Sequence, residues 1–214
     1  MVKAVVFDFD GVLVESVDVK TEAFRKLFLP YGVDVAEKVV VYHMAHGGLS
    51  RFEKIRYCFA NFIREPLTPK MEMELGDRFS HIVLEDVIAA PYVAGAREAL
   101  EALYTKVPLF VASGTPDDEL KLIVERRGME KYFQGVYGAP ESKGSIVFGI
   151  LERTGMAPDE MVFVGDAMTD YDAAMEHGVH FIGRRTQAWN SFDGLNVRVV
   201  YDLRTLPELL EIIA

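Results

Sequence analysis

Residues 5–13 read Val-Val-Phe-Asp-Phe-Asp-Gly-Val-Leu and place two carboxylates, two positions apart, at the end of a short apolar run. The run is β-branched and too short for a helix, so it predicts a buried strand. Alternation along a strand points Asp8 and Asp10 to the same side, while Gly11 allows a sharp turn and a close approach of the backbone to a ligand. Two crowded acids are costly unless a cation or a shared proton compensates them. The stretch therefore indicates a site, although Asp and Gly are also ordinary turn residues.

The composition limits the classes of partner. The chain has 214 residues, half of them apolar, and a formal net charge of −10. This acidic balance argues against nucleic-acid and anionic-membrane partners, although a metal can reverse the field within one cleft. Cys58 is the only cysteine, so no intrachain disulfide can form. Without a leader-like start or an apolar run of membrane-spanning length, we expect a soluble cytoplasmic protein.

Strand-like runs alternate with helical patterns over most of the chain, which predicts a parallel α/β sheet with crossover helices. The expected strands are residues 4–7, 108–112, 135–137, 161–164, 180–182 and 197–200. The expected crossover helices are residues 95–104, 117–127, 144–153, 170–176 and 206–213. No strand-like run interrupts the region after the first strand, where the expected helices are residues 18–28, 36–43, 50–63 and 71–88. A helical insertion after the first strand explains this pattern.

Polar residues follow several of the predicted strands, and ligands of open α/β sheets bind beyond the carboxyl ends of strands. Ser113 and the amides after it suit an oxyanion, although Ser113 could equally cap the next helix. Asp166 directly follows a buried run, whereas Asp170 alone would be interpreted as a helix cap. Lys143 begins a helix, where a cation opposes the helix dipole, and either lies in solvent or contacts an anion.

These motifs form an ordered set: Asp-x-Asp-Gly, Ser-Gly-Thr, a lysine, and Gly-Asp-x-x-x-Asp. The set resembles the haloacid dehalogenase superfamily of phosphotransferases over essentially the whole chain. The resemblance implies a Rossmann-like core of residues 1–14 and 91–214, with a mostly parallel sheet flanked by helices. It also implies an all-α cap of residues 15–90, inserted after strand 1. Asp10 is typical of the phosphatase and phosphomutase branch, because the dehalogenases lack it and phosphonate-cleaving relatives carry a small residue there.

The resemblance also implies roles. Asp8 is the expected nucleophile that forms an aspartyl-phosphate, and Asp10 the general acid and then the general base. Asp8 must be ionised and Asp10 partly protonated, and their proximity is expected to separate their titrations. Mg²⁺ is the expected cofactor, with Asp8, Asp10 through its backbone carbonyl, and Asp166 as ligands. Asp170 is either a water-mediated ligand or a partner of Lys143. The expected phosphate-binding residues are Gly11, Ser113, Gly114 and Lys143.

The cap carries the candidates for substrate choice. Arg51 resembles the arginine with which β-phosphoglucomutases hold a second, non-reacting phosphate, but it could equally lie exposed on its helix. Lys20 stands where those mutases carry a histidine that limits hydrolysis; it favours hydrolysis, and it either reaches the substrate or lies in solvent. His43 and His46 are expected to pack or make polar contacts, because no further Cys/His cluster supports a metal site. Trp189 either packs or borders the site.

The sequence therefore predicts a Mg²⁺-dependent phosphatase that hydrolyses a small phosphorylated metabolite, such as a sugar phosphate or phosphoglycolate, as a monomer or homodimer. One alternative is a phosphomutase similar to β-phosphoglucomutase. Another is a non-catalytic phospho-acceptor module of the receiver type, which is disfavoured because its acceptor aspartate follows a later strand, where this chain has Ser113.

Overall fold

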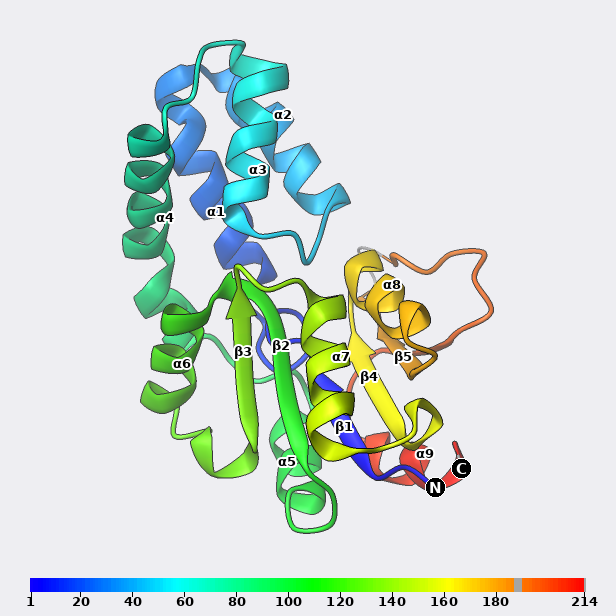
Figure 1. The fold of residues 1–214 in the computed structure, drawn as a ribbon. Coiled ribbons are helices and arrows are strands. Elements are labelled where there is room, and N and C mark those ends of the chain that lie inside the picture. The colour runs from blue at the N-terminus through cyan, green and yellow to red at the C-terminus, as the bar shows by residue number, and fades with distance from the viewer. Residues whose placement is uncertain (187–189, 214) are drawn as a thin grey trace.

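Six parallel strands form the centre of the protein in the computed structural model, which describes residues 1–186 and 190–213 (Figure 1). The strands are β1 (Ala4–Phe7), β2 (Leu109–Pro116), β3 (Gly135–Ala139), β4 (Met161–Gly165), β5 (His180–Arg184) and β6 (Arg198–Val200). Their order in the sheet is β3-β2-β1-β4-β5-β6, and every neighbouring pair is parallel. This confirms the predicted α/β fold. The predicted place of Trp189 falls outside the described residues.

Both faces of the sheet are covered by helices, which explains why the strands are continuous apolar runs. Alternate residues of β1 face opposite cores: Val5 and Phe7 belong to one buried cluster, and Ala4 and Val6 to the other. The first cluster includes residues of α5 (Ala96–Leu103), α6 (Asp117–Arg126) and α9 (Leu206–Ile212). The second includes residues of α7 (Lys143–Thr154) and α8 (Met168–Glu176).

The middle of the sheet determines where polar residues can meet. β1 lies between β2 and β4, so the carboxyl ends of these three strands share one edge. β2 is longer than predicted, because Ser113, Gly114 and Thr115 continue the strand after Ala112 with a shift in register against β3. The small polar residues are typical of a loop, which is why the sequence predicts an earlier end.

Four helices lie together beyond this edge, as the blue to teal ribbons of Figure 1 show. They are α1 (Val17–Phe28), α2 (Val33–Ala45), α3 (Arg51–Cys58) and α4 (Pro69–Ala89). The predicted helix over residues 50–63 is α3 followed by a π-helical turn, Phe59–Ile63. The backbone N–H of Glu15 donates to the carbonyl of Pro91 at 2.9 Å, so the chain leaves and re-enters the sheet layer at adjacent points. We refer to residues 15–90 as the cap.

The cap has an aromatic interior, in which Phe24 packs against Phe79 with ring centroids 4.4 Å apart. Cys58 is buried in this interior and unpaired, as expected. The longest helix of the described residues, α4, carries charged residues along its length. Within residues 1–186 and 190–213, none of the helices has the length and apolar character that crossing a membrane requires.

Candidate active site

Asp8 follows the last residue of β1 and is 3% exposed. The backbone N–H of Phe9 donates to its Oδ1 at 2.7 Å, and Nζ of Lys143 lies 3.0 Å from its Oδ2. The same lysine Nζ lies 2.5 Å from Oδ1 of Asp170. Lys143 is buried at the first position of α7. The solvent-exposed alternative for this lysine is therefore wrong, and it bridges two carboxylates at the sheet edge.

Three buried carboxylates meet at this point. One oxygen from each of Asp8, Asp166 and Asp170 lies within 4.8 Å of the others. The second oxygen of Asp170 accepts hydrogen bonds from the backbone N–H groups of Asp166, at 3.2 Å, and Ala167, at 3.0 Å. Burial and the neighbouring acids raise the pKa of Asp8 to about 7, against the opposing effect of Lys143, and raise the pKa of Asp166 well above its usual range. The edge therefore carries more negative charge than one lysine offsets.

Gly11 is required by the geometry of the turn after Asp10. Its φ is +76°, and a side-chain carbon there would collide with the carboxylate of Asp166. Arg184 holds the same turn, since its Nη1 donates to the carbonyl of Gly11 at 2.9 Å while its Nη2 pairs with Glu15 at 2.6 Å. This positioning role of Arg184 was missed from the sequence, where it is a plain arginine at the end of a strand.

Asp10 lies in a different electrostatic environment. Its Oδ1 accepts from the Ser16 hydroxyl at 2.6 Å, and its Oδ2 accepts from Nζ of Lys20 at 2.5 Å and from the Thr115 hydroxyl at 3.2 Å. Burial opposes ionisation of Asp10, but Lys20 and these hydrogen bonds hold its pKa below the usual value. The expected order of titration is therefore reversed in the protein alone: burial and the neighbouring acids raise the pKa of Asp8 despite Lys143, whereas Lys20 and hydrogen bonds lower the pKa of Asp10 despite burial.

The Ser-Gly-Thr motif faces the same edge. Ser113 is buried, and its Oγ accepts from the backbone N–H of Thr115 at 3.2 Å rather than capping α6. A side-chain carbon on Gly114 would lie 2.5 Å from the carbonyl oxygen of Gly48, in the cap loop between α2 and α3. The hydroxyl of Thr169 on α8 donates to the neighbouring carbonyl of Gly47 at 3.3 Å. The cap loop thus lies directly against the carboxyl edge of the sheet.

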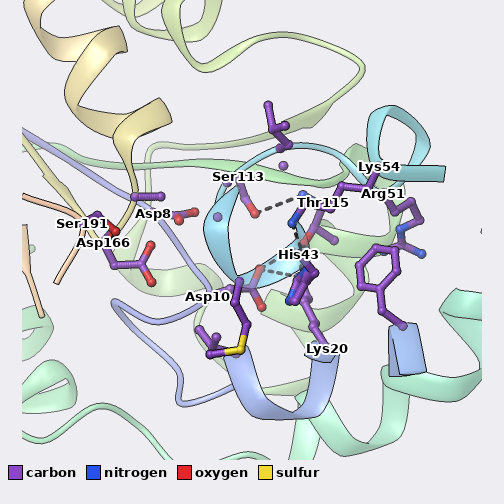
Figure 2. A pocket seen from close by; sticks show the side chains of 18 of the residues that line it. Asp8, Asp10, Lys20, His43, Arg51, Lys54, Ser113, Thr115, Asp166 and Ser191 are labelled. Carbon is purple, nitrogen blue, oxygen red and sulfur yellow. Dashed lines mark hydrogen bonds and ion pairs between the residues drawn. The ribbon is translucent and has the colours of Figure 1, made fainter. Parts of the chain in front are cut away.

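A cavity separates the cap from the edge of the sheet. Figure 2 shows the side chains around it, with acids and Ser113 from the sheet edge and basic groups from the cap. Its labelled lining residues are Asp8, Asp10, Lys20, His43, Arg51, Lys54, Ser113, Thr115, Asp166 and Ser191. Of the predicted site residues, Asp8, Asp10, Ser113, Gly114, Asp166, Lys20 and Arg51 line this cavity. Lys143 lines a neighbouring cleft instead, and its Nζ lies 3.0 Å from Oδ2 of Asp8.

The comparisons with known proteins agree with this arrangement. The sequence model of the haloacid dehalogenase-like hydrolases matches residues 5–184. The chain belongs to this family. A phosphorylated carbohydrates phosphatase of Thermotoga maritima is 28% identical over 195 residues, which cover 84% of this chain and 83% of the relative. A phosphoglycolate phosphatase of Shigella boydii is 26% identical over 206 residues, covering 85% and 81%.

The fold of this haloacid dehalogenase-like hydrolase is also found among solved structures. The β-phosphoglucomutase of Clostridium difficile matches with a TM-score of 0.78 at 16% identity, covering 100% of this chain and 97% of the other. This likeness bears on the fold alone. The predicted family and fold are confirmed, and the predicted enzyme class, a phosphoric monoester hydrolase, is that of the two phosphatase relatives.

Arg51 is buried beside the cavity and is already paired with a carboxylate. It is 4% exposed, and its guanidinium bonds both carboxylate oxygens of Glu119 on α6, at 2.5 and 2.9 Å. Nη1 also donates to the hydroxyl of Ser80 on α4 at 2.5 Å, and the guanidinium stacks over the ring of Phe79 at 4.7 Å. Arg51 is therefore not exposed, and a carboxylate of the core already offsets its charge. A role for Arg51 in holding a substrate phosphate stays a prediction.

The two cap histidines lie in different surroundings. His46 stacks on Tyr42 and contacts its backbone carbonyl at 2.9 Å, whereas His43 is buried with its Nδ1 2.9 Å from Nζ of Lys54. This agrees with the expected packing and polar contacts. Lys54 was missed from the sequence, because nothing in the pattern of α3 distinguishes it from a solvent-exposed helix lysine, yet it is 3% exposed and lines the cavity.

Proposed function

We propose that this hydrolase is a Mg²⁺-dependent phosphatase that acts on a small phosphorylated metabolite, of the sugar phosphate or phosphoglycolate type, through an aspartyl-phosphate on Asp8. The observation that carries the proposal is the pairing of one buried lysine, Lys143, with two carboxylates, those of Asp8 and Asp170. Of these, Asp8 lines the cap cavity. The names of the two curated relatives support the substrate class.

The residues at the edge fit a divalent cation. Asp8, Asp166 and Asp170 are buried together, and Lys143 offsets only part of their charge. Burial, together with the neighbouring acids, raises the pKa values of Asp8 and Asp166, and Lys143 only partly opposes this rise. Clustered oxygen donors are what Mg²⁺ prefers. We infer that Asp8, Asp166 and the backbone carbonyl of Asp10 hold the ion, while Asp170 orients Lys143.

When bound, Mg²⁺ supplies positive charge that favours ionised Asp8 and offsets the charge of the phosphoryl oxygens. The chain positions the nucleophile itself, because the Phe9 N–H holds one oxygen of Asp8 and Lys143 the other. An oxygen of Asp8 then forms a bond to phosphorus as the bond from phosphorus to the leaving oxygen breaks. The Ser113 hydroxyl, the Gly114 amide and Lys143 are the groups that would stabilise the phosphoryl oxygens in that step.

Asp10 is the proposed proton carrier. It gives a proton to the departing oxygen, then accepts one from the water that attacks phosphorus, which releases phosphate and regenerates Asp8. Although burial opposes ionisation, Lys20 lowers the pKa of Asp10, so the pair favours the ionised form that the water step needs, and the first step uses the protonated form. Hydrolysis rather than phosphomutase activity is supported by Lys20 itself, which stands where β-phosphoglucomutases carry a histidine that limits hydrolysis. Arg51, on which the mutase alternative depends, is already paired with Glu119.

The test is phosphate release from 2-phosphoglycolate, β-glucose 1-phosphate and p-nitrophenyl phosphate, with Mg²⁺ and with excess EDTA. The proposal predicts steady release that requires Mg²⁺. Conversion of β-glucose 1-phosphate to its isomer without net phosphate release, in the presence of a bisphosphate activator, would instead establish a mutase. Stable phosphorylation without turnover would establish the receiver-type alternative.

A further inference from the structure

Three lysine or arginine side chains of the cap line the cavity, and their charges are balanced differently. Lys20 pairs with Asp10 at 2.5 Å, and Arg51 pairs with Glu119 at 2.5 Å. Lys54 makes no ion pair with any carboxylate of residues 1–186 and 190–213; its hydrogen-bond partner is the ring of His43. The cavity wall on the cap side therefore presents one cationic group without a counter-charge.

The two rings beside Lys54 are uncharged and do not offset the charge of its ammonium. Its Nζ lies 2.9 Å from Nδ1 of His43 and 5.6 Å from the ring centre of Phe24. Burial and the neighbouring lysines lower the pKa of His43 to about 2, so its imidazole is neutral and accepts from Lys54 through Nδ1. Burial also lowers the pKa of Lys54 to about 7. A buried ammonium paired with a neutral ring and an aromatic face is costly, and an anion from outside the protein would relieve that cost.

We propose that Lys54 and His43 form a subsite for a second anionic group, a carboxylate or a phosphate, on the leaving group of the substrate. The assignment rests on the proposed phosphatase function, since it takes the reacting phosphate to lie at Asp8. Both residues line the same cavity as Asp8 and Ser113, on the opposite wall (Figure 2). A phosphomonoester bound at the sheet edge would extend its leaving group toward the cap, where the Lys54 ammonium and, with Nδ1 accepting from Lys54, the Nε2–H of His43 can both donate hydrogen bonds.

Arg51, the residue expected from the sequence to hold such a group, fits the role less well. An anion that binds its guanidinium would share it with Glu119, whose carboxylate already offsets the charge of Arg51. Lys54 has no such carboxylate partner within the described residues. The subsite is therefore one turn further along α3 than Arg51, on a residue that pairs with no carboxylate of the described residues and whose ammonium form an anion would stabilise.

The test compares Lys54→Met, which keeps the length of a buried side chain and removes its charge, with Lys38→Met, which makes the same change at an exposed position of α2. The substrates are 2-phosphoglycolate, ethylene glycol bisphosphate and n-propyl phosphate, whose leaving groups carry a carboxylate, a phosphate and no charge, respectively.

The wild-type enzyme is expected to have a higher kcat/KM for one or both anionic substrates than for n-propyl phosphate. Lys54→Met should lower kcat/KM for a favoured substrate about 10- to 100-fold, the loss of a charged hydrogen bond, and change that for n-propyl phosphate by less than about threefold. Lys38→Met should alter neither.

Equal losses on charged and uncharged substrates would overturn the subsite, because they would show that Lys54 only supports the fold. An absence of loss would overturn it as well. If wild type shows no preference for an anionic leaving group, the proposal is contradicted whether or not the variant folds.

Failure of the proposed phosphatase function is a separate result, seen as no phosphate release from any ester. In that case, isothermal titration calorimetry with 3-phosphonopropionate and with n-butylphosphonate, in the presence of Mg²⁺, still tests whether Lys54 and His43 bind a second anionic group. Tighter binding of the carboxylate compound by wild type, lost in Lys54→Met, supports it, and equal binding contradicts it.

Discussion

The carboxyl edge of the sheet and the cap wall that faces it both bury unbalanced charge, but with opposite signs. At the edge, three carboxylates meet, and one lysine, Lys143, pairs with two of them. On the cap wall, Lys54 is buried, and within the described residues its hydrogen-bond partner is a neutral histidine. Charge buried in this way is unfavourable for the protein alone, so each wall indicates the ligand that would balance it. The edge suits a cation, and the cap suits an anion.

The difference also separates two residues that look equivalent in sequence. Arg51 and Lys54 lie on the same helix and line the same cavity. Arg51 is neutralised by Glu119 and links the cap to α6, whereas Lys54 makes no ion pair within the described residues. A cationic residue near a substrate cavity is therefore a candidate for binding only when its charge remains available.

The largest effect is expected at the edge. Asp8→Asn removes the proposed nucleophile, so phosphate release should fall at least about 10⁴-fold and no phosphoenzyme should form. Rapid-quench assays with intact-mass analysis measure both. The matched control is Asp118→Asn, an exposed acid in the first turn of α6, which should retain activity. Retained phosphate release in Asp8→Asn would contradict the assignment of the nucleophile.

The next effect concerns the neutralised cap residue. Glu119→Gln leaves the guanidinium of Arg51 buried without its carboxylate, which should lower the free energy of unfolding by about 3 kcal/mol. Urea denaturation measures this loss. The control, Glu85→Gln, breaks an exposed pair with Arg126 that also joins α4 to α6, and little change is expected. If Glu119→Gln instead raises kcat/KM selectively for anionic substrates, Arg51 rather than Lys54 holds the second anion.

A third prediction concerns the buried carboxylates at the sheet edge, whose charge Lys143 offsets only in part. The pKa of Asp8 is raised from 3.8 to about 7, so the folded protein holds a proton over this range that the unfolded chain has released. The stability of the metal-free protein should therefore fall as the pH rises from about 4 to 7. Mg²⁺ at a hundredfold excess over its Kd should raise Tm by about 5–10 °C above pH 7, and by less at pH 5.

Differential scanning fluorimetry at several pH values, with Mg²⁺ and with EDTA, measures this stabilisation. Asp166→Asn removes a proposed ligand and should abolish most of it. A Tm that does not respond to Mg²⁺ at any pH would show that the edge does not bind the ion.

The smallest effect is expected where the two walls meet. Thr115→Val removes the hydroxyl that donates to Asp10 and accepts from Lys20, and should lower kcat about three- to tenfold. Because one hydrogen bond that lowers the pKa of Asp10 is lost, the acidic limb of the pH–rate profile should move to higher pH. Thr21→Val, which removes a hydroxyl bonded within α1, is the control. A profile that shifts to lower pH would contradict this role of Thr115.

The sequence predicts the edge well because each of its groups belongs to a short motif at a strand end. Asp8, Lys143 and Asp166 are recognised from neighbours within a few residues, and parallel strands bring their carboxyl ends together. The alternation of strands and helices likewise predicts every element of the sheet, with small errors at the ends, such as the extension of β2 through Thr115.

The sequence predicts the cap less well because its charges are balanced by distant partners. Arg51 and Glu119 are 68 positions apart, and they meet only when α3 and α6 are packed across the cavity. Lys54 and His43 lie on different helices, and only the packed cap shows that the lysine is buried without an acid. The spacing of apolar residues predicts which face of a helix is buried, but it does not predict which charged residue of another element will lie opposite that face.

The most direct test of opposite charge on the two walls is a crystal structure of the Mg²⁺-loaded protein with 3-phosphonopropionate. We expect Mg²⁺ at Asp8 and Asp166, the phosphonate beside Ser113 and Lys143, and the carboxylate within hydrogen-bond distance of Lys54 and His43. A carboxylate bound by Arg51 with Glu119 displaced, or one directed into solvent, would contradict it.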